Sequence, residues 1–181
     1  MNTAKGRPSN VSADQFIDTA KTAGWYIMTG HTECGISSDI DVKLSYQGTT
    51  TATSNIDGAN RCASANDNKS VVDFGSLSGT TLAFACTRFR TVSGWKYKEI
   101  YEADIRFDNT SRSWVTKTTG CTGEKYDLLS VAVHEFGHFV GLNHAPEEGG
   151  SDLTMSPIIE PCNGGARTLG KGDIRGLEIP Y

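Results

Sequence analysis

The sequence lacks the features that mark membrane-spanning and nucleic-acid-binding proteins. No apolar run approaches the length of about 20 residues that crosses a bilayer, and the longest near the centre, residues 128–133, is one helix segment. The 17 lysines and arginines form no cluster, and 21 aspartates and glutamates leave a net charge of −4. The composition therefore gives no reason to expect nucleic acid, an anionic membrane surface or a membrane span.

The sequence also lacks CxxC pairs, internal repeats and an apolar N-terminal stretch. Its wide cysteine spacing favours disulfides over a cysteine metal site, although a free cysteine is also simply a small buried hydrophobe. The five cysteines are Cys34, Cys62, Cys86, Cys121 and Cys162. Because disulfides form in oxidising compartments, we expect a secreted, extracellular protein, and the odd count leaves at least one thiol free or paired outside the chain. Residues 1–7 are polar and not a signal peptide, so an exported form would be mature or trimmed.

The remaining pattern predicts one α+β domain. A chain of 181 residues fits a single hydrophobic core, and we expect an N-terminal arm over residues 1–11 followed by one domain over residues 12–181. Four segments read as strands from their alternation or composition: residues 39–46, 70–74, 80–89 and 97–107. In the last of these, strict alternation places Ile100 on the same face as Glu102, Asp104 and Arg106.

Three helices are predicted from apolar spacing and end signals. Ser12 has the character of an N-cap, with Gln15 at the capping-box position of a helix that ends near Gly30. A second helix begins near Asp127 and ends at Gly141, because glycine readily adopts the left-handed conformation at a helix end. A short helix over residues 171–178 closes the chain, and the polar stretch over residues 47–68 is expected to be a long loop. Helix, strands, helix, loop and helix in this order are typical of an α+β fold.

The segment from His134 to His144 carries the clearest chemical signal. His134 and His138 are four residues apart, so on a helix they project from one face and can reach a single ion. Gly141 turns the backbone and brings His144 round as a third imidazole. Three neutral imidazoles leave the fourth tetrahedral position of zinc open for water, as catalytic sites require. The pattern predicts one catalytic Zn²⁺ ion held by the three histidines.

Glu135 completes this constellation. Zinc lowers the pKa of its bound water and polarises a substrate carbonyl, and Glu135 is placed to take the proton of that water and pass it to the leaving amine. A lone histidine pair at this spacing is usually surface or core histidine. From the frequencies of His, Glu and Gly in this chain, however, chance would produce the whole pattern about once in 10⁵ such chains. His31 is left over, and we interpret it as a loop residue.

The pattern His-Glu-x-x-His-x-x-Gly-x-x-His, followed by a methionine turn at residues 153–157, resembles the metzincin zinc peptidases. Within that group the chain most resembles the matrixins, the matrix-metalloproteinase-like branch. Residues 79–85 are similar to their upper edge strand, residues 103–114 to their last strand and the following turn, and residues 169–177 to their C-terminal helix. The likeness covers about residues 12–181.

This resemblance implies a metzincin-like, zincin-type catalytic domain: a mixed, twisted sheet whose edge strand lies over the cleft, an active-site helix, a Met-turn and a C-terminal helix. It implies that Met155 lies beneath the metal as an apolar floor. A polypeptide substrate would add a strand to the edge formed by Thr81, Leu82, Ala83, Phe84 and Ala85. Pro157, Ile158 and Ile159 would line the pocket for the residue after the scissile bond, which would then be apolar.

The chain also departs from the animal matrixins, which typically carry a second, structural zinc. Arg106 stands at the strand position of one of its histidine ligands, and no histidine occurs between Thr32 and Tyr126, so we expect no structural zinc. Calcium (Ca²⁺) binding is left open, because Asp108 is present at the family's calcium turn but Ser111 stands where a glutamate is common.

The leading hypothesis is a monomeric zinc-dependent endopeptidase that hydrolyses extended polypeptides. One alternative is a catalytically silent, zinc-stabilised protein-binding module, and another is a zinc hydrolase that acts on a different bond. The presence of Glu135 and the open coordination position argue against the silent module, because structural zinc normally has four protein ligands.

Overall fold

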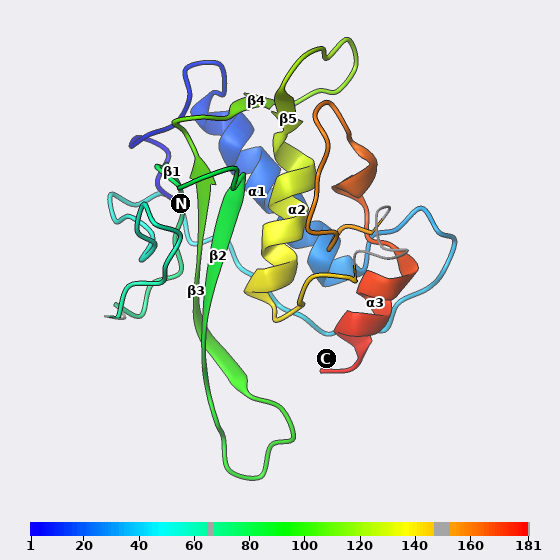
Figure 1. The fold of residues 1–181 in the computed structure, drawn as a ribbon. Coiled ribbons are helices and arrows are strands. Elements are labelled where there is room, and N and C mark those ends of the chain that lie inside the picture. Colours follow the sequence, from blue (N-terminus) through cyan, green and yellow to red (C-terminus); the bar gives the residue numbers. More distant parts are fainter. Residues whose placement is uncertain (65–66, 147–152, 181) are drawn as a thin grey trace.

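The computed structural model describes residues 1–64, 67–146 and 153–180 and has an α+β architecture (Figure 1). Its described residues form three α-helices, five strands and one short 3₁₀ helix. In chain order these are α1 (Ala13–Thr29), β1 (Val72–Gly75), β2 (Ala83–Arg90), β3 (Glu99–Asp108), β4 (Ser113–Val115), β5 (Lys125–Asp127), α2 (Leu128–Phe139), η1 (Gly165–Arg167) and α3 (Lys171–Glu178). The predicted α+β class and the three predicted helices are confirmed.

Helix α1 begins and ends where its sequence signals place it. The Ser12 hydroxyl accepts a hydrogen bond from the Gln15 amide, and the Gln15 side chain accepts one from the Ser12 amide, which forms a capping box. Gly30 ends the helix in the left-handed conformation, with φ of 58°. The buried face of α1, which includes Phe16 and Ile27, packs against α2 and the sheet.

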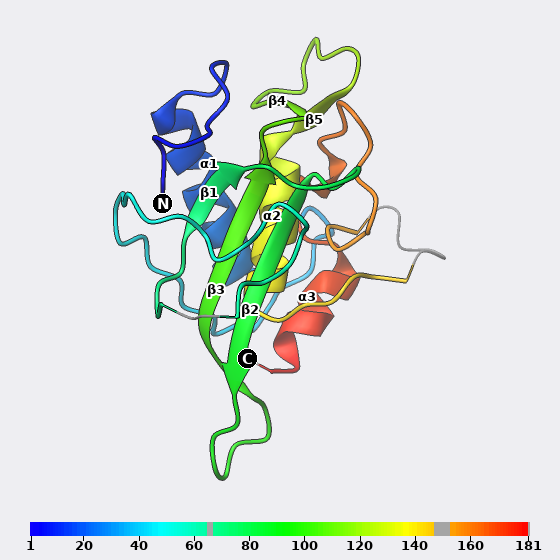
Figure 2. The ribbon, with the colours of Figure 1, turned by 60° about the vertical axis from the view of Figure 1, so that its left-hand side comes forward.

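The main sheet is mixed and has the strand order β1-β3-β2. β3 lies in the centre, parallel to β1 and antiparallel to β2, so β2 forms an edge of the sheet. One face of the sheet packs against α1 and α2, and the chain between α1 and β1 crosses the other face (Figure 2). On the helix side, Phe16, Phe74, Phe107 and Trp114 form a ring cluster with centroids 4.6 to 6.1 Å apart. Burial of these large rings is a main source of the core's stability.

Charged side chains attach the chain between α1 and β1 to the face of the sheet that it crosses, called the loop side here. Glu102, Asp104 and Arg106 alternate along β3 toward this side, and Arg106 forms an ion pair with Asp73 with 3.0 Å between nitrogen and oxygen. The Asp104 carboxylate accepts hydrogen bonds from the amides of Val71 and Asn55. Burial raises the pKa of Asp104 to about 6. These side chains attach the long loop to the sheet, and the disulfide Cys62–Cys86 adds a covalent link at the same place.

The predicted disulfide bonding is confirmed by two bridges, Cys62–Cys86 and Cys121–Cys162, and Cys34 is free and exposed. Among the helices of the described residues, none combines the length and the apolarity needed to cross a membrane. Residues 1–11 contain no helix or strand but pack on the domain. The Asn2 amide donates to the carbonyl of Val72, and Val11 is completely buried.

Two sequence predictions for strands are wrong in detail. Residues 39–46 form no strand, because their alternating apolar side chains Ile40, Val42 and Leu44 pack into the core while their backbone has no strand beside it. Ile100 does not share a face with Glu102: the register advances from Arg88↔Glu102 to Phe89↔Ile100, so an extra residue, Tyr101, stands in β3. Such a β-bulge reverses the alternation beyond it. The three-residue strands β4 and β5 are too short to show a period in the sequence.

Candidate metal centre

Helix α2 carries two of the three predicted ligands and is buried along most of its length. Asp127 caps its start by accepting hydrogen bonds from the amide and hydroxyl of Ser130, each at 2.8 Å. Arg167 forms an ion pair with the same carboxylate at 2.6 Å, so the start of the helix is fixed to the chain that precedes α3. All residues from Leu128 to Gly137 except Leu129 are buried, including His134 and Glu135. A helix held this firmly gives its side chains a defined direction.

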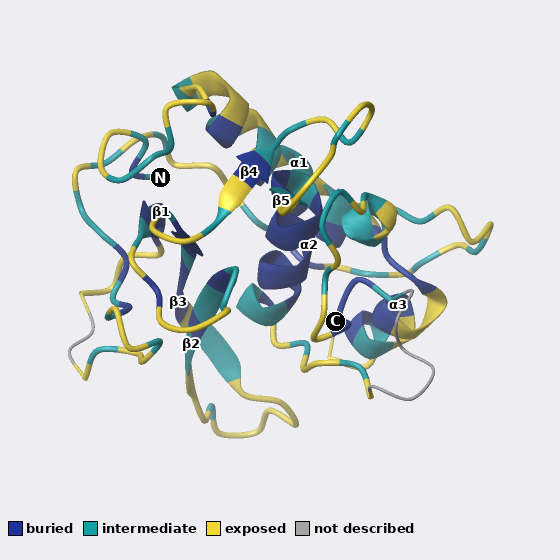
Figure 3. Ribbon diagram, turned by 45° about the horizontal axis from the view of Figure 1, so that its top comes forward, coloured by how far each residue is buried: buried dark blue, intermediate teal, exposed yellow. Residues whose placement is uncertain are grey.

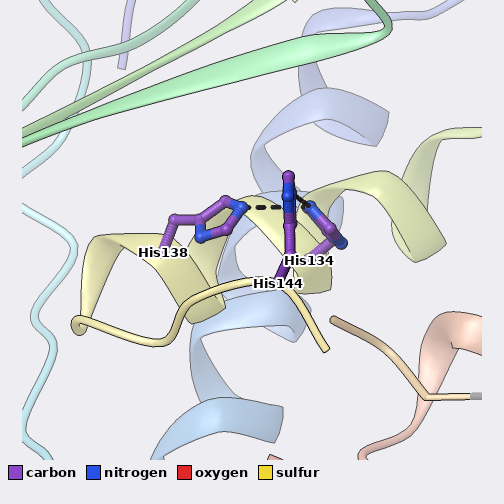
Figure 4. Close-up of side chains that lie close together, drawn as sticks. All are labelled: His134, His138 and His144. Carbon is purple, nitrogen blue, oxygen red and sulfur yellow. Dashed lines mark hydrogen bonds between the residues drawn. The ribbon is translucent and has the colours of Figure 1, made fainter. Parts of the chain in front are cut away.

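The structure brings the three predicted histidines together (Figure 4). The Nε2 atom of His134 lies 3.1 Å from that of His138 and 3.2 Å from that of His144. Three nitrogens bound to one tetrahedral zinc at about 2.0–2.1 Å lie about 3.4 Å from one another. The spacing of the imidazoles therefore fits a single ion of this size.

The second ring nitrogens show which protonation state fits this arrangement. Nδ1 of His134 lies 2.8 Å from the carbonyl oxygen of Thr154, and Nδ1 of His138 lies 2.7 Å from that of Leu142. Because a carbonyl oxygen only accepts, both Nδ1 atoms carry the proton, and both Nε2 lone pairs point toward their neighbours. Burial lowers the pKa of His134 to about 4, which keeps this imidazole neutral. Facing lone pairs repel one another unless a cation lies between them, so the donor set fits a metal ion.

His144 reaches the other two histidines because the chain reverses after α2. Gly141 has φ of 97°, a conformation that favours glycine, and the amide of Leu142 donates to the carbonyl of Gly137 at 2.9 Å. The amide of Ala145, next to His144, donates to the carbonyl of Met155 at 2.8 Å. The third imidazole is thus tied to the turn that contains the methionine.

Met155 is 2% exposed, and its sulfur packs closely against Gly137 on α2. A Cβ atom at Gly137 would lie 2.3 Å from that sulfur, closer than atoms can approach. We expect Gly137→Ala to lower the free energy of unfolding by about 1–3 kcal/mol, because the side chain must move in a closely packed site. Urea denaturation measures this change.

Gly24→Ala is the matched control, since Gly24 also lies in a helix but a Cβ there would meet its neighbours at an ordinary 3.7 Å. This variant should be as stable as the parent or more stable by up to about 1 kcal/mol. Equal effects of the two substitutions would contradict close packing between Gly137 and Met155.

Glu135 lies beside the histidines and has an unusual environment. Its side chain is buried, and Oε2 has no hydrogen-bond partner among the described residues. Burial raises the pKa of this carboxyl group to about 8. A buried carboxyl oxygen without a partner is costly for a folded protein and indicates a group kept for chemistry or for a bound ion.

The histidines and Glu135 lie in a cleft of about 1000 Å³ below the edge strand β2. All five residues predicted to pair with substrate, from Thr81 to Ala85, line this cleft. Pro157 and Ile159 line it as well, whereas Ile158 is 62% exposed and is not among its lining residues. An edge strand above three imidazoles leaves space for an extended chain to pass between them.

Some supporting residues could not be found from the sequence. Asp173, in the first turn of α3, accepts hydrogen bonds from the amides of Thr154 and Met155, and thereby holds the carbonyl that orients His134. Thr87 donates its hydroxyl hydrogen bond to the carbonyl of His138 and joins β2 to the end of α2. An acidic residue early in a helix signals capping, but no sequence pattern indicates that Asp173 also supports a turn 18 residues away.

Other residues considered for metal binding have different partners. His31 stacks on Tyr26 with ring centroids 4.2 Å apart, away from the three histidines. Arg106 is engaged with Asp73 and with the backbone of Ile56. The Asp108 carboxylate accepts hydrogen bonds from the amides of Leu77 and Ser111 and the hydroxyl of Thr110, among others. The calcium prediction therefore gains no support from the geometry of Asp108.

Comparison with known proteins adds an independent finding. The family model described as Matrixin matches residues 36–181. The chain is 33% identical to human Matrix metalloproteinase-20 over 78 residues, which are 43% of this chain and 14% of that protein. It is 47% identical to Metalloendoproteinase 5-MMP of Arabidopsis thaliana over 57 residues, 30% of this chain and 14% of that protein. The match to each of these relatives covers only a small part of its length.

Proposed function

The chain belongs to the matrixin family, and we propose that it is a zinc-dependent endopeptidase that hydrolyses peptide bonds within extended polypeptides. One observation carries this proposal: three converging imidazole nitrogens lie beside a buried carboxyl oxygen that has no hydrogen-bond partner among the residues the structure describes, in a cleft bordered by an edge strand. A site that only stabilised the fold would need no such free carboxyl group.

His134, His138 and His144 would hold one zinc ion through their Nε2 atoms, and Met155 would provide the apolar floor. Zinc, when bound, polarises a carbonyl group and lowers the pKa of water. The carbonyls of Thr154 and Leu142 fix the ring orientations of His134 and His138. Calcium binding remains an open expectation.

Glu135 would move the proton. In its ionised form, which the positive charge of a bound zinc ion would favour against the effect of burial, its carboxylate takes a proton from the attacking water as the water oxygen bonds to the peptide carbonyl carbon. The protonated carboxyl group then gives this proton to the amide nitrogen as the carbon–nitrogen bond breaks, so an amine and a carboxylic acid leave. Oε2 has no hydrogen-bond partner in the described parts of the chain, which supports this role because the oxygen is then able to exchange a proton.

Residues 81–85 would bind the substrate backbone as an added strand, with Pro157 and Ile159 around the residue that follows the scissile bond; Ile158, which points out of the cleft, is left out of this pocket. Apolar pocket walls discriminate between side chains by about 1–3 kcal/mol. We therefore expect cleavage before leucine or methionine to be about tenfold or more faster than cleavage before aspartate. A peptide library analysed by mass spectrometry measures this ratio.

The same library tests the proposed function itself. No cleavage by the zinc-loaded protein would contradict the endopeptidase and favour the silent binding module. Cleavage with no preference for an apolar residue would contradict the pocket alone. A sample treated with phenanthroline is the blank, since removal of the metal should stop the reaction and added zinc should restore it.

We further propose a secreted monomer with an N-terminal arm over residues 1–11 and one catalytic domain over residues 12–181. The two disulfides support secretion, because such bonds persist mainly outside the cytosol.

A further inference from the structure

The hairpin formed by the ends of β2 and β3 extends beyond the body of the domain (Figures 1 and 2). Its outer part, residues 89–101, is mostly exposed (Figure 3). Four aromatic side chains are exposed by about a third or more: Phe89 at 54%, Trp95 at 65%, Tyr97 at 37% and Tyr101 at 36%. Four exposed aromatic side chains within thirteen residues are a common feature of surfaces that contact another molecule.

The bulge at Tyr101 turns Ile100, on the β3 side of this hairpin, toward the cleft. Before the bulge, the Thr87 side chain faces α2 while Arg88 and Glu102 face the loop side. Beyond it, the pair Phe89↔Ile100 faces the cleft, and Ile100 reaches the backbone at Gly141. Bulges near binding sites commonly redirect side chains in this way.

As a result, the cleft continues onto the hairpin. Phe89, Tyr97, Lys98 and Ile100 line the same cleft as His134 and Glu135. Phe89 is four residues beyond Ala85, which is a distance of about 13 Å along a strand. A polypeptide that pairs with residues 81–85 and continues in the same direction would reach these side chains.

The charge of the hairpin is opposite to that of the whole chain. Residues 89–101 contain one arginine and two lysines against one glutamate, whereas the chain has a net charge of −4. Arg90 pairs with Glu99 at 2.7 Å. Lys98 lies over the Phe89 ring at 4.2 Å and Lys96 over the Tyr97 ring at 5.0 Å, and neither forms an ion pair in the described parts of the chain. Among the described residues that line the cleft, Glu135 is the one carboxylate.

We propose that this hairpin is a second substrate-binding surface, which selects polypeptides with acidic side chains several residues to one side of the scissile bond. The proposal rests on the proposed peptidase function and adds a substrate class to it. The aromatic rings supply apolar contact, and Lys96 and Lys98 supply the charge that an acidic segment requires. Continuity with the cleft favours a substrate chain over a separate partner, because the same extended molecule would meet both surfaces.

The test uses one cleavable core peptide extended by three aspartates, three asparagines or three lysines, on its amino or its carboxyl side. On one of the two sides, the aspartate extension should lower KM about fivefold relative to asparagine, the size expected for partly exposed ion pairs. The kcat value should change less than twofold, since Glu135 and the histidines are not involved. Raising the salt concentration to 0.5 M should remove most of the gain.

Lys96→Glu combined with Lys98→Glu should reverse the preference, so that the lysine extension has the lower KM. The matched control, Lys117→Glu combined with Lys171→Glu, changes the net charge equally at exposed lysines outside the cleft and should behave like the parent. If the hairpin lysines had only a structural role, their replacement would raise KM for all three kinds of extended peptide alike. It would not reverse the order of KM between the aspartate and lysine extensions.

Fluorescence anisotropy of the same labelled peptides with the Glu135→Gln protein gives a readout that needs no cleavage. Acid-selective binding that the hairpin variant reverses supports the surface even if no peptide is cut, in which case the peptidase proposal fails alone. Equal KM and equal binding for aspartate and asparagine extensions on both sides, or acid selectivity that persists in the hairpin variant, overturns the inference.

Discussion

Replacing Glu135 with glutamine should lower kcat/KM for peptide cleavage by about a thousandfold, the upper part of the range for loss of a general acid–base group. Glutamine has the size and shape of glutamate, so the buried site should keep its packing. Its amide cannot accept the proton of the attacking water or return it to the leaving amine. The three imidazole nitrogens are untouched by this change, so the protein should still bind one zinc ion per chain.

Steady-state kinetics and elemental analysis of the same preparation separate these two expectations. Glu160→Gln is the matched control, because it removes an exposed glutamate that does not line the cleft. This control should cut peptides at the parent rate. Near-normal cleavage by the Glu135→Gln protein would rule out the proposed proton transfer, whatever its zinc content.

Replacing His144 with alanine should weaken zinc binding by more than about a hundredfold and abolish cleavage. Loss of a group that only orients a ligand typically costs 10- to 100-fold in metal affinity, and loss of the ligand itself should cost more. His144 is the exposed member of the group, so the substitution leaves no cavity in the core and should not disturb the fold by another route. Zinc titration against a chromophoric chelator measures the affinity.

His31→Ala provides the comparison, because His31 stacks on Tyr26 and lies apart from the metal centre. The zinc affinity of this variant and its rate of peptide cleavage should match those of the parent protein. If His144→Ala bound zinc as tightly as the parent, the third ligand would have to be another residue, and the proposed arrangement of the site would be wrong.

Residues close together in the sequence were the best predicted. The capping box of Ser12 and Gln15, the start of α2 at Asp127 and the meeting of His134 with His138 all depend on contacts within one helix. Such contacts follow from the helical period, so the sequence shows them directly. His144 was also predictable, because Gly141, three residues before it, signals the end of the helix and the reversal of the chain.

Features that depend on distant partners could not be predicted. Residues 39–46 have the alternation of a strand, yet they form none, and their apolar side chains pack on the core that includes α1. The bulge at Tyr101 results from how β2 and β3 pair, and it reverses the expected face of Ile100. The support of the methionine turn by Asp173 joins residues that only the folded chain brings together.

The family resemblance seen in the sequence is confirmed by the match over residues 36–181. The hairpin illustrates what such a resemblance leaves undetermined. Phe89, Tyr97 and Lys98 are visible as residues in the sequence, but only the folded hairpin shows that they line the cleft, and only its bulge turns Ile100 toward it. Substrate selection by residues 89–101 is therefore a property that the structure suggests and the motif does not.

Anomalous diffraction at the zinc absorption edge, from crystals of the zinc-loaded protein, tests the metal centre most directly. The account predicts one peak about 2.0–2.1 Å from the Nε2 atoms of His134, His138 and His144, with no fourth protein side chain in contact. A peak elsewhere, a peak with His144 turned away, or a fourth protein ligand that closes the site would contradict it.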